Sequence, residues 1–189
     1  SIPFALPATH HAINLLLHIT AAILLLKNLE ALKLTTAFSA ALVFALHPAA
    51  MQTIFWSGYR AELIGLILIL AALYFGIKNR NMKDYIMLTV ICVIAYISHP
   101  AALFLPPLLG LCIFYQNESF RFKEYNRLLP LFCLALFFGV WTQGVSANAE
   151  LEWGERFGIS AQSLLFYLKQ ALFPIELALF YPFEQTKGF

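Results

Sequence analysis

The residues best suited to chemistry gather in one stretch, residues 47–62, which lies between two long apolar runs. An ordinary turn between membrane helices needs only a few small or polar residues. This stretch instead carries candidate ligand-binding side chains, namely His47, Gln52, Arg60 and Glu62. A charge at the edge of an apolar run is costly unless it faces a hydrated cavity or a partner, which favours a ligand-binding loop. The alternative is an interfacial aromatic belt of Trp56 and Tyr59, with Arg60 reaching the headgroups.

A second polar pattern lies in the first apolar run. His11, Asn14 and His18 have the spacing i, i+3, i+7 and share one face of a helix. A metal site needs ligands that converge from several elements, and no carboxylate accompanies these histidines. We therefore expect a hydrogen-bonded stripe that faces protein, and no metal site. No cofactor is evident, and a divalent metal is left open.

Composition sets the class of protein. Of 189 residues, 61% are hydrophobic and 12% are charged, and the mean hydropathy is +0.76. A soluble domain of this size would not tolerate such a surface, so we predict an all-α, polytopic membrane helix bundle with membrane lipids as partners. A net charge of +2 without a basic run indicates no nucleic-acid partner. The cysteines lie in apolar runs without metal or disulfide spacing, at Cys92, Cys112 and Cys133.

Apolar runs and their breaks predict about six transmembrane helices. Pro48 should end the second span, and Pro106 and Pro107 should kink the fifth. His99 precedes Pro100, where the fourth span ends. The expected spans cover residues 10–26, 34–46, 63–77, 85–98, 101–115 and 128–145.

Basic residues in the connections predict the orientation. Eight lysines and arginines fall in residues 27–33, 78–83 and 116–127, whereas the alternate connections carry only Arg60 and Arg156. By the positive-inside rule the basic set is cytoplasmic, which puts Ser1, the 47–62 stretch and His99 outside. The predicted location is a multi-pass protein of a bacterial inner membrane or an ER-type membrane.

The last apolar segment, residues 159–180, permits two interpretations. Ser163, Tyr167 and Gln170 form a polar face opposite several leucines, and Lys169 lies near the middle. This pattern favours a helix at the outer interface that ends at Pro174 and helps to wall a cavity with the 47–62 stretch. The alternative is a seventh span that carries the chain to the cytoplasm.

Four motifs occur in an order that resembles a known family: HHAINLLLH, HPAAMQTIFWSGYRAEL, ISHPAALFLPPLLGL and SLLFYLKQALFPIELALFYPF. They are similar to the membrane half of GT-C-type glycosyltransferase-like proteins. The nearest subgroup is the transmembrane O-mannosyltransferase-like proteins with tetratricopeptide repeats. In place of the family's frequent glutamate the chain has Gln52, and in place of Lys-Glu it has His99-Pro100.

The resemblance implies transfer of a sugar from a polyprenyl-phosphate donor at the outer membrane face. It places His47, Gln52, Arg60 and Glu62 in the outer-facing loop. We expect substrate to be bound by these four residues together with His99 and Lys169. Arginine suits phosphate because its planar fork binds two oxygens, with Lys169 as the second cation. His47 or His99 would serve as a general base, or act as a helix cap.

The family's catalytic acid lies in a first outer loop that precedes the HHAIN motif, so the catalytic residue is unknown and expected upstream of Ser1. We interpret residues 1–189 as one membrane domain, an excerpt that lacks the first span and first outer loop. The expected function is a membrane glycosyltransferase. The alternative is a non-catalytic GT-C-like subunit that scaffolds a complex with other membrane subunits. A transporter is disfavoured because the charges cluster at one face.

Overall fold

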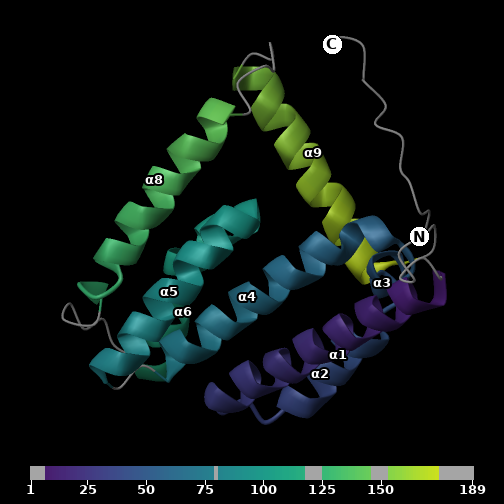
Figure 1. Ribbon diagram of the computed structural model, residues 1–189, viewed down its shortest axis with the longest axis horizontal. Coiled ribbons are helices and arrows are strands. Elements are labelled where there is room, and N and C mark those ends of the chain that lie inside the picture. Colours follow the sequence, from purple (N-terminus) through teal and green to yellow (C-terminus); the bar gives the residue numbers. More distant parts are fainter. Residues whose placement is uncertain (1–6, 79–80, 118–124, 146–152, 175–189) are drawn as a thin grey trace, which may run out of the picture.

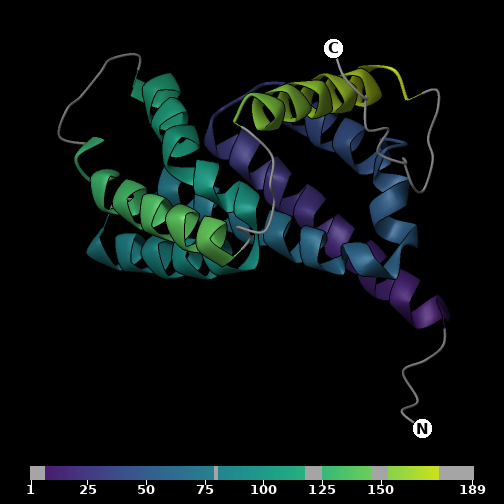
Figure 2. The same ribbon diagram turned by 90° about the horizontal axis from the view of Figure 1, so that it is seen from above.

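The computed structural model describes residues 7–78, 81–117, 125–145 and 153–174. Every regular element in these ranges is helical (Figures 1 and 2). The longer helices are α1 (Pro7–Ala31), α2 (Ala37–Leu46), α4 (Arg60–Ile77), α5 (Met82–Ser98), α6 (Leu105–Asn117), α8 (Leu129–Val145) and α9 (Trp153–Leu172). Short elements are α3 (Ala50–Phe55) and the 3₁₀ turns η1 (Ser57–Tyr59) and η2 (Pro100–Phe104).

Three stretches are long and apolar enough to cross a membrane, namely Thr9–Ala31, Arg60–Ile77 and Pro100–Asn117. Shorter apolar helices occupy Ala37–Leu46 and Leu129–Thr142. Large apolar side chains on their outer surfaces are exposed, as a surface facing acyl chains requires. This confirms the predicted all-α membrane helix bundle, while the count of six spans stays a prediction.

Helix α4 is the central element of the bundle. It packs against α1 on one side and against α5 and α6 on the other (Figure 1). Its buried side chains join those of its neighbours in one apolar core. That core includes Ala21, Leu70, Leu73, Leu88, Cys92, Tyr96, Leu105, Leu109 and Leu131.

Helix α1 is longer than the apolar run that predicted it. The run ends at Leu26, and residues 27–33 read as a connection, yet the helix continues to Ala31. Asn28 is buried there and its amide donates to the carbonyls of Leu24 and Leu70, at 2.8 and 2.9 Å. Because Asn28 is hydrogen-bonded to a neighbouring helix, α1 continues through this polar residue. Hydropathy alone therefore placed the end of α1 too early.

Pro48 ends α2 at Leu46, as predicted, but residues 47–62 are not an open loop. The chain forms α3 and η1 before α4 begins at Arg60. Ten residues of α2 rise only about 15 Å, too little to cross a hydrocarbon core of about 30 Å. Helices α2 and α3 both pack along α1, so together they line it as one broken helix.

The predicted polar stripe of α1 faces this broken helix. The Asn14 amide donates to the carbonyls of Thr53, Ile54 and Trp56, at 3.3, 3.3 and 3.1 Å. The His18 ring bonds the Ala45 carbonyl at 3.2 Å, and His11 meets Phe55 edge to face. Carbonyls freed at the ends of helices need internal partners in a membrane, and the stripe provides them.

Pro106 and Pro107, which were expected to kink the fifth span, lie in the first turn of α6. These prolines are the second and third residues of α6, where backbone N–H groups have no intrahelical acceptor anyway. Just before them, at Leu105, the 3₁₀ turn η2 passes into the α-helical geometry of α6. The prolines therefore begin a helix and do not bend one.

Helix α9 lies across the direction of α4 in Figure 1, and its last turn contacts His47, just before α3. Ser163, Phe166 and Gln170 lie on its partly buried face, whereas Leu164 and Leu168 are exposed. The leucines thus point away from the bundle, as an interfacial helix requires. Tyr167 does not belong to the inner face, because it is also exposed. The expectations for residues 175–180 lie outside the described residues.

Candidate functional site

Arg60, the first residue of α4, is held by two side chains of α1. Its Nε donates to Asn14 Oδ1 at 3.3 Å, and its Nη2 donates to His10 Nδ1 at 2.9 Å. His10 and Asn14 are one helical turn apart and so share a face of α1. Because a guanidinium only donates, Nδ1 of His10 must be the unprotonated ring nitrogen. The half-buried arginine is therefore fixed in position before any ligand arrives.

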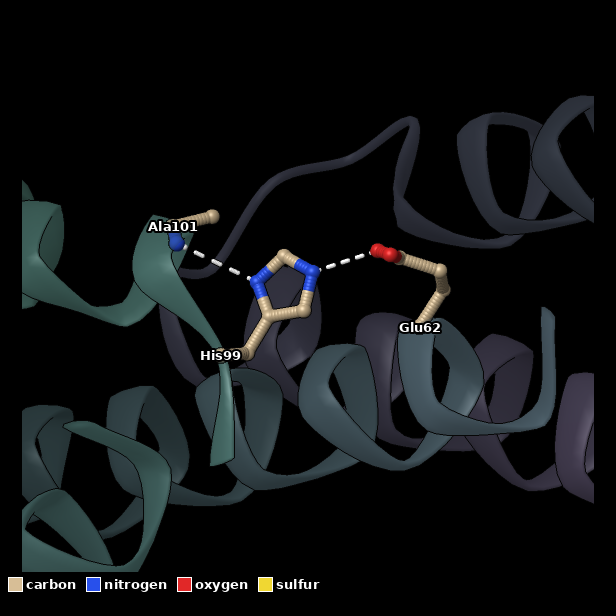
Figure 3. A network of polar contacts seen from close by, with 3 residues as sticks. All are labelled: Glu62, His99 and Ala101. Carbon is tan, nitrogen blue, oxygen red and sulfur yellow. Dashed lines mark hydrogen bonds and ion pairs between the residues drawn. The ribbon is translucent and has the colours of Figure 1, made fainter. Parts of the chain in front are cut away.

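Glu62 and His99 form a second polar contact at the same end of the bundle (Figure 3). Nδ1 of His99 accepts from the Ala101 backbone N–H at 3.1 Å. The ring proton then lies on Nε2, which donates to Oε2 of Glu62. Glu62 remains half exposed, at 51%, so the carboxylate stays open to a ligand.

The sequence His-Pro-Ala-Ala occurs twice and adopts the same local structure each time. Nδ1 of His47 accepts from the Ala49 N–H at 3.2 Å, as that of His99 does from Ala101. Each histidine carbonyl accepts from the alanine three residues on, at 2.9 and 3.0 Å. His99 is the N-cap of η2 with Pro100 at its first position, and His47 and Pro48 form the same kind of turn just before α3. Each Nε2 is left to bond another helix.

His47 connects this end of the bundle to α9. Its Nε2 bonds the Ala171 carbonyl at 3.0 Å. Lys169, exposed in the last turn of α9, therefore lies in the segment attached to His47. Gln52 belongs to α3, but its side chain lies outside the described residues. Four of the predicted residues, Arg60, Glu62, His99 and His47, thus make three separate contacts at one end of the bundle.

Arg60 and Glu62 contact different helices and not each other. Residues two apart on a helix point in nearly opposite directions, so Arg60 faces α1 and Glu62 faces α5. The spacing alone was enough to exclude a pair between them. Sequence reasoning also missed His10 as the second partner of Arg60. Its spacing of four from Asn14 was the available signal.

The parts of the chain that the structure describes hold no group of three histidine, cysteine or acidic side chains placed to bind a metal ion. The side chains gathered at this end are a fixed guanidinium, a half-exposed carboxylate and imidazoles that each accept a hydrogen bond at Nδ1. Such groups bind an anion and a hydroxyl-bearing partner.

Fold and site together define a membrane helix bundle with a cationic and acidic cluster at one end. The chain is 29% identical over 144 residues to Protein O-mannosyl-transferase F38B6.6 of Caenorhabditis elegans. This match covers 73% of the chain but only 20% of the relative, so the chain spans about a fifth of that protein. No protein-family model and no solved structure matches. The likeness supports a distant mannosyltransferase-like relationship.

Proposed function

We propose that this bundle is the membrane part of a glycosyltransferase-like protein that uses a polyprenyl-phosphate-linked sugar at the outer membrane face. The observation that carries the proposal is the fixed position of Arg60 at the end of α4. The distant O-mannosyltransferase likeness supports the class of reaction. We include in this proposal the polyprenyl-phosphate donor, the position of the site at the outer membrane face and the membership of the chain in the GT-C group.

Arg60 has capacity for a phosphate beyond its protein contacts. A guanidinium has five N–H donors. Two of them bond Asn14 and His10, which leaves three without a partner among the described residues. Charge-assisted, two-point bonds from arginine to phosphate are among the stronger hydrogen bonds in proteins. Because His10 and Asn14 already order the side chain, little conformational entropy is lost on binding.

Binding of a polyprenyl-phosphate mannose to the protein in nanodiscs tests the proposal. Arg60→Ala should lower the affinity about tenfold or more, and Arg60→Lys should impair it too, because an ammonium does not reproduce the two-point contact. Lys27→Gln is the matched control, since Lys27 is an exposed cation of α1 outside this cluster. Equal affinity of Arg60→Ala and the parent would refute the role of Arg60.

A second candidate is a non-catalytic subunit that retains the bundle as a scaffold. The observation that favours it is the structural use of His47 and His99, because each ring already makes a hydrogen bond at both nitrogens. Transfer of radiolabelled mannose to a hydroxyl-bearing peptide distinguishes the two. Donor binding without transfer by the full-length protein supports the scaffold, and transfer that Arg60→Ala abolishes supports the enzyme.

A further inference from the structure

A groove lies between α6 and α8. It has a volume of about 560 Å³, within the range of roughly 300–1,000 Å³ typical of ligand sites. Its walls are almost wholly apolar and include Gly110 and Phe114 of α6 and Phe132 of α8. The Tyr125 hydroxyl donates to the Gly110 carbonyl at 3.2 Å and so closes one side of the groove. An apolar chain, and not a polar solute, fits this space.

A smaller polar recess adjoins the groove and shares Leu128 with it. The recess has a volume of about 200 Å³, and its lining includes Tyr85, Gln116 and Arg127. The Tyr85 hydroxyl donates to the Arg127 carbonyl at 3.0 Å, which fixes the backbone beside the recess. The exposed Arg127 guanidinium has no acidic partner among the described residues, and no acidic side chain lines the recess.

We infer that the groove and recess form one binding site for an anionic glycerophospholipid. An acyl chain lies in the groove between α6 and α8, and the phosphate group accepts hydrogen bonds from Arg127. The two parts match the two halves of such a lipid, because the apolar groove and the basic, hydrogen-bonding recess share Leu128 as a common wall. Basic pockets between membrane helices are characteristic headgroup sites.

The position of the site in the bundle agrees with this ligand. Gln116, in the recess, donates to the Ala31 carbonyl at 3.3 Å, so the recess lies at the end opposite Arg60. The sequence predicts that this basic end is cytoplasmic. Anionic lipids concentrate in the cytoplasmic leaflet. The site is therefore separate from the proposed donor site, and it does not depend on the proposed function.

Native mass spectrometry of the purified protein tests the site with phosphatidylglycerol and phosphatidylcholine of identical acyl chains. The parent should bind phosphatidylglycerol about fivefold more tightly. Arg127→Gln should remove this preference, and Gly110→Phe should weaken binding of both lipids by filling the groove. Lys83→Gln is the control, because Lys83 is an exposed cation at the same end that lines neither space.

Three results would overturn the inference. They are equal binding of the two lipids by the parent, an unchanged preference in Arg127→Gln, and tighter binding of a polyprenyl phosphate than of phosphatidylglycerol. Photoactivatable phosphatidylglycerol gives a readout that needs no variant. Cross-links should map to Phe114 and Phe132 in preference to Phe38, which is exposed on α2. Equal labelling at Phe38 would count against a defined site.

Discussion

Gly65 sets how closely α5 can approach α4 beside the Glu62 contact. It is three residues after Glu62 and so lies on the same face of α4, toward His99. A Cβ at this position would lie 2.7 Å from the Cβ and 2.8 Å from the Cγ of His99. Those distances are too short for carbon atoms in contact, so the imidazole would have to move. The absence of a side chain at this position is thus a requirement of the site.

We predict that Gly65→Ala lowers the free energy of unfolding by about 1–3 kcal/mol, the usual cost of overpacking. It should also separate His99 from Glu62. The measurement is the thermal unfolding midpoint in detergent. Gly110→Ala is the matched control, because its new Cβ would meet Tyr125 and Leu128 at the ordinary distances of 3.6 and 3.7 Å. An equal loss in both variants would contradict the argument.

Asn14 is a fully buried residue that connects three backbone carbonyls to Arg60. Asn14→Leu has a similar volume but leaves those carbonyls and the arginine Nε without this partner. The expected loss of stability is roughly 1–3 kcal/mol. Donor binding should fall as well, because Arg60 loses one of its two supports. Both changes are measurable on one preparation, by thermal unfolding and by donor titration.

Thr20→Val is the control for Asn14. Thr20 is exposed on the same helix, and its hydroxyl donates to the Leu16 carbonyl one turn back, at 2.8 Å. Such a surface change should alter stability by no more than about 0.5 kcal/mol. If Asn14→Leu behaves like Thr20→Val, then Asn14 is not a structural connection between α1 and the α3 segment.

Much of the site could be read from residue type, but its pairings could not. Charge and polarity between apolar runs were enough to select Arg60, Glu62, His47 and His99. The partners depend on which faces of α1, α4 and α5 meet, and this is a property of packing. The spacing of Asn14 and His18 predicted a stripe that faces protein, and the structure confirms it. The carbonyls that the stripe serves became apparent only once α2 and α3 were in place.

At the scale of elements, the histidine of each His-Pro-Ala-Ala motif uses one ring nitrogen to cap its own turn and the other to contact a neighbouring helix. Nδ1 of His99 performs the first role and Nε2 the second. Asparagine at the same position can accept the Ala101 N–H, as asparagine caps do, but it does not extend as far as an imidazole. Replacement by leucine removes both functions.

We predict that His99→Leu destabilises the protein by about 0.5–2 kcal/mol, the usual value of a helix cap, and that His99→Asn loses less. Both should release Glu62. Unfolding midpoints of the two variants, compared with those of His47→Leu and His47→Asn, provide the test. The second pair has the same Nδ1 contact with the backbone N–H two residues on but a different Nε2 partner. A loss in His99→Asn as large as in His99→Leu would show that capping is not what stabilises this turn.

Hydropathy located most helices but misjudged how several begin and end. The apolar run from residue 101 to 115 did not reveal where α6 begins. Pro106 and Pro107 lie in the middle of that run but in the first turn of α6, where proline is compatible with a helix. Asn81 and Asp84 form a capping box, so α5 begins at Met82, before the predicted start at Tyr85. These ends depend on caps and buried amides, which an average over apolar residues cannot register.

For the whole molecule, the contacts divide the bundle into two ends. Arg60, Glu62 and His47 make their contacts at one end. Contacts of Gln116 with Ala31 and of Tyr85 with Arg127 lie at the other. The connections therefore separate as the alternation of basic residues predicts. Which end faces the cytoplasm stays a prediction of the positive-inside rule.

Both ends of α9 should lie on the same side of the membrane as Arg60. The Ala171 carbonyl bonds His47, and Leu164 and Leu168 point away from the bundle, as they would if they entered the acyl region of an interface. A helix of 20 residues is long enough to span, so its length does not decide between the two interpretations.

We therefore predict that cysteines at Gly154 and Phe173 react with a membrane-impermeant maleimide from the outer side, and that one at Lys83 does not. All three positions are exposed, and a Cβ at Gly154 would meet no neighbour among the described residues. The parent chain, whose three cysteines lie in apolar helices, gives the background. Labelling of Phe173→Cys only after permeabilisation, with Gly154→Cys labelled from outside, would make α9 a seventh span. Outer labelling of Lys83→Cys would reverse the whole topology and place Arg60 in the cytoplasm.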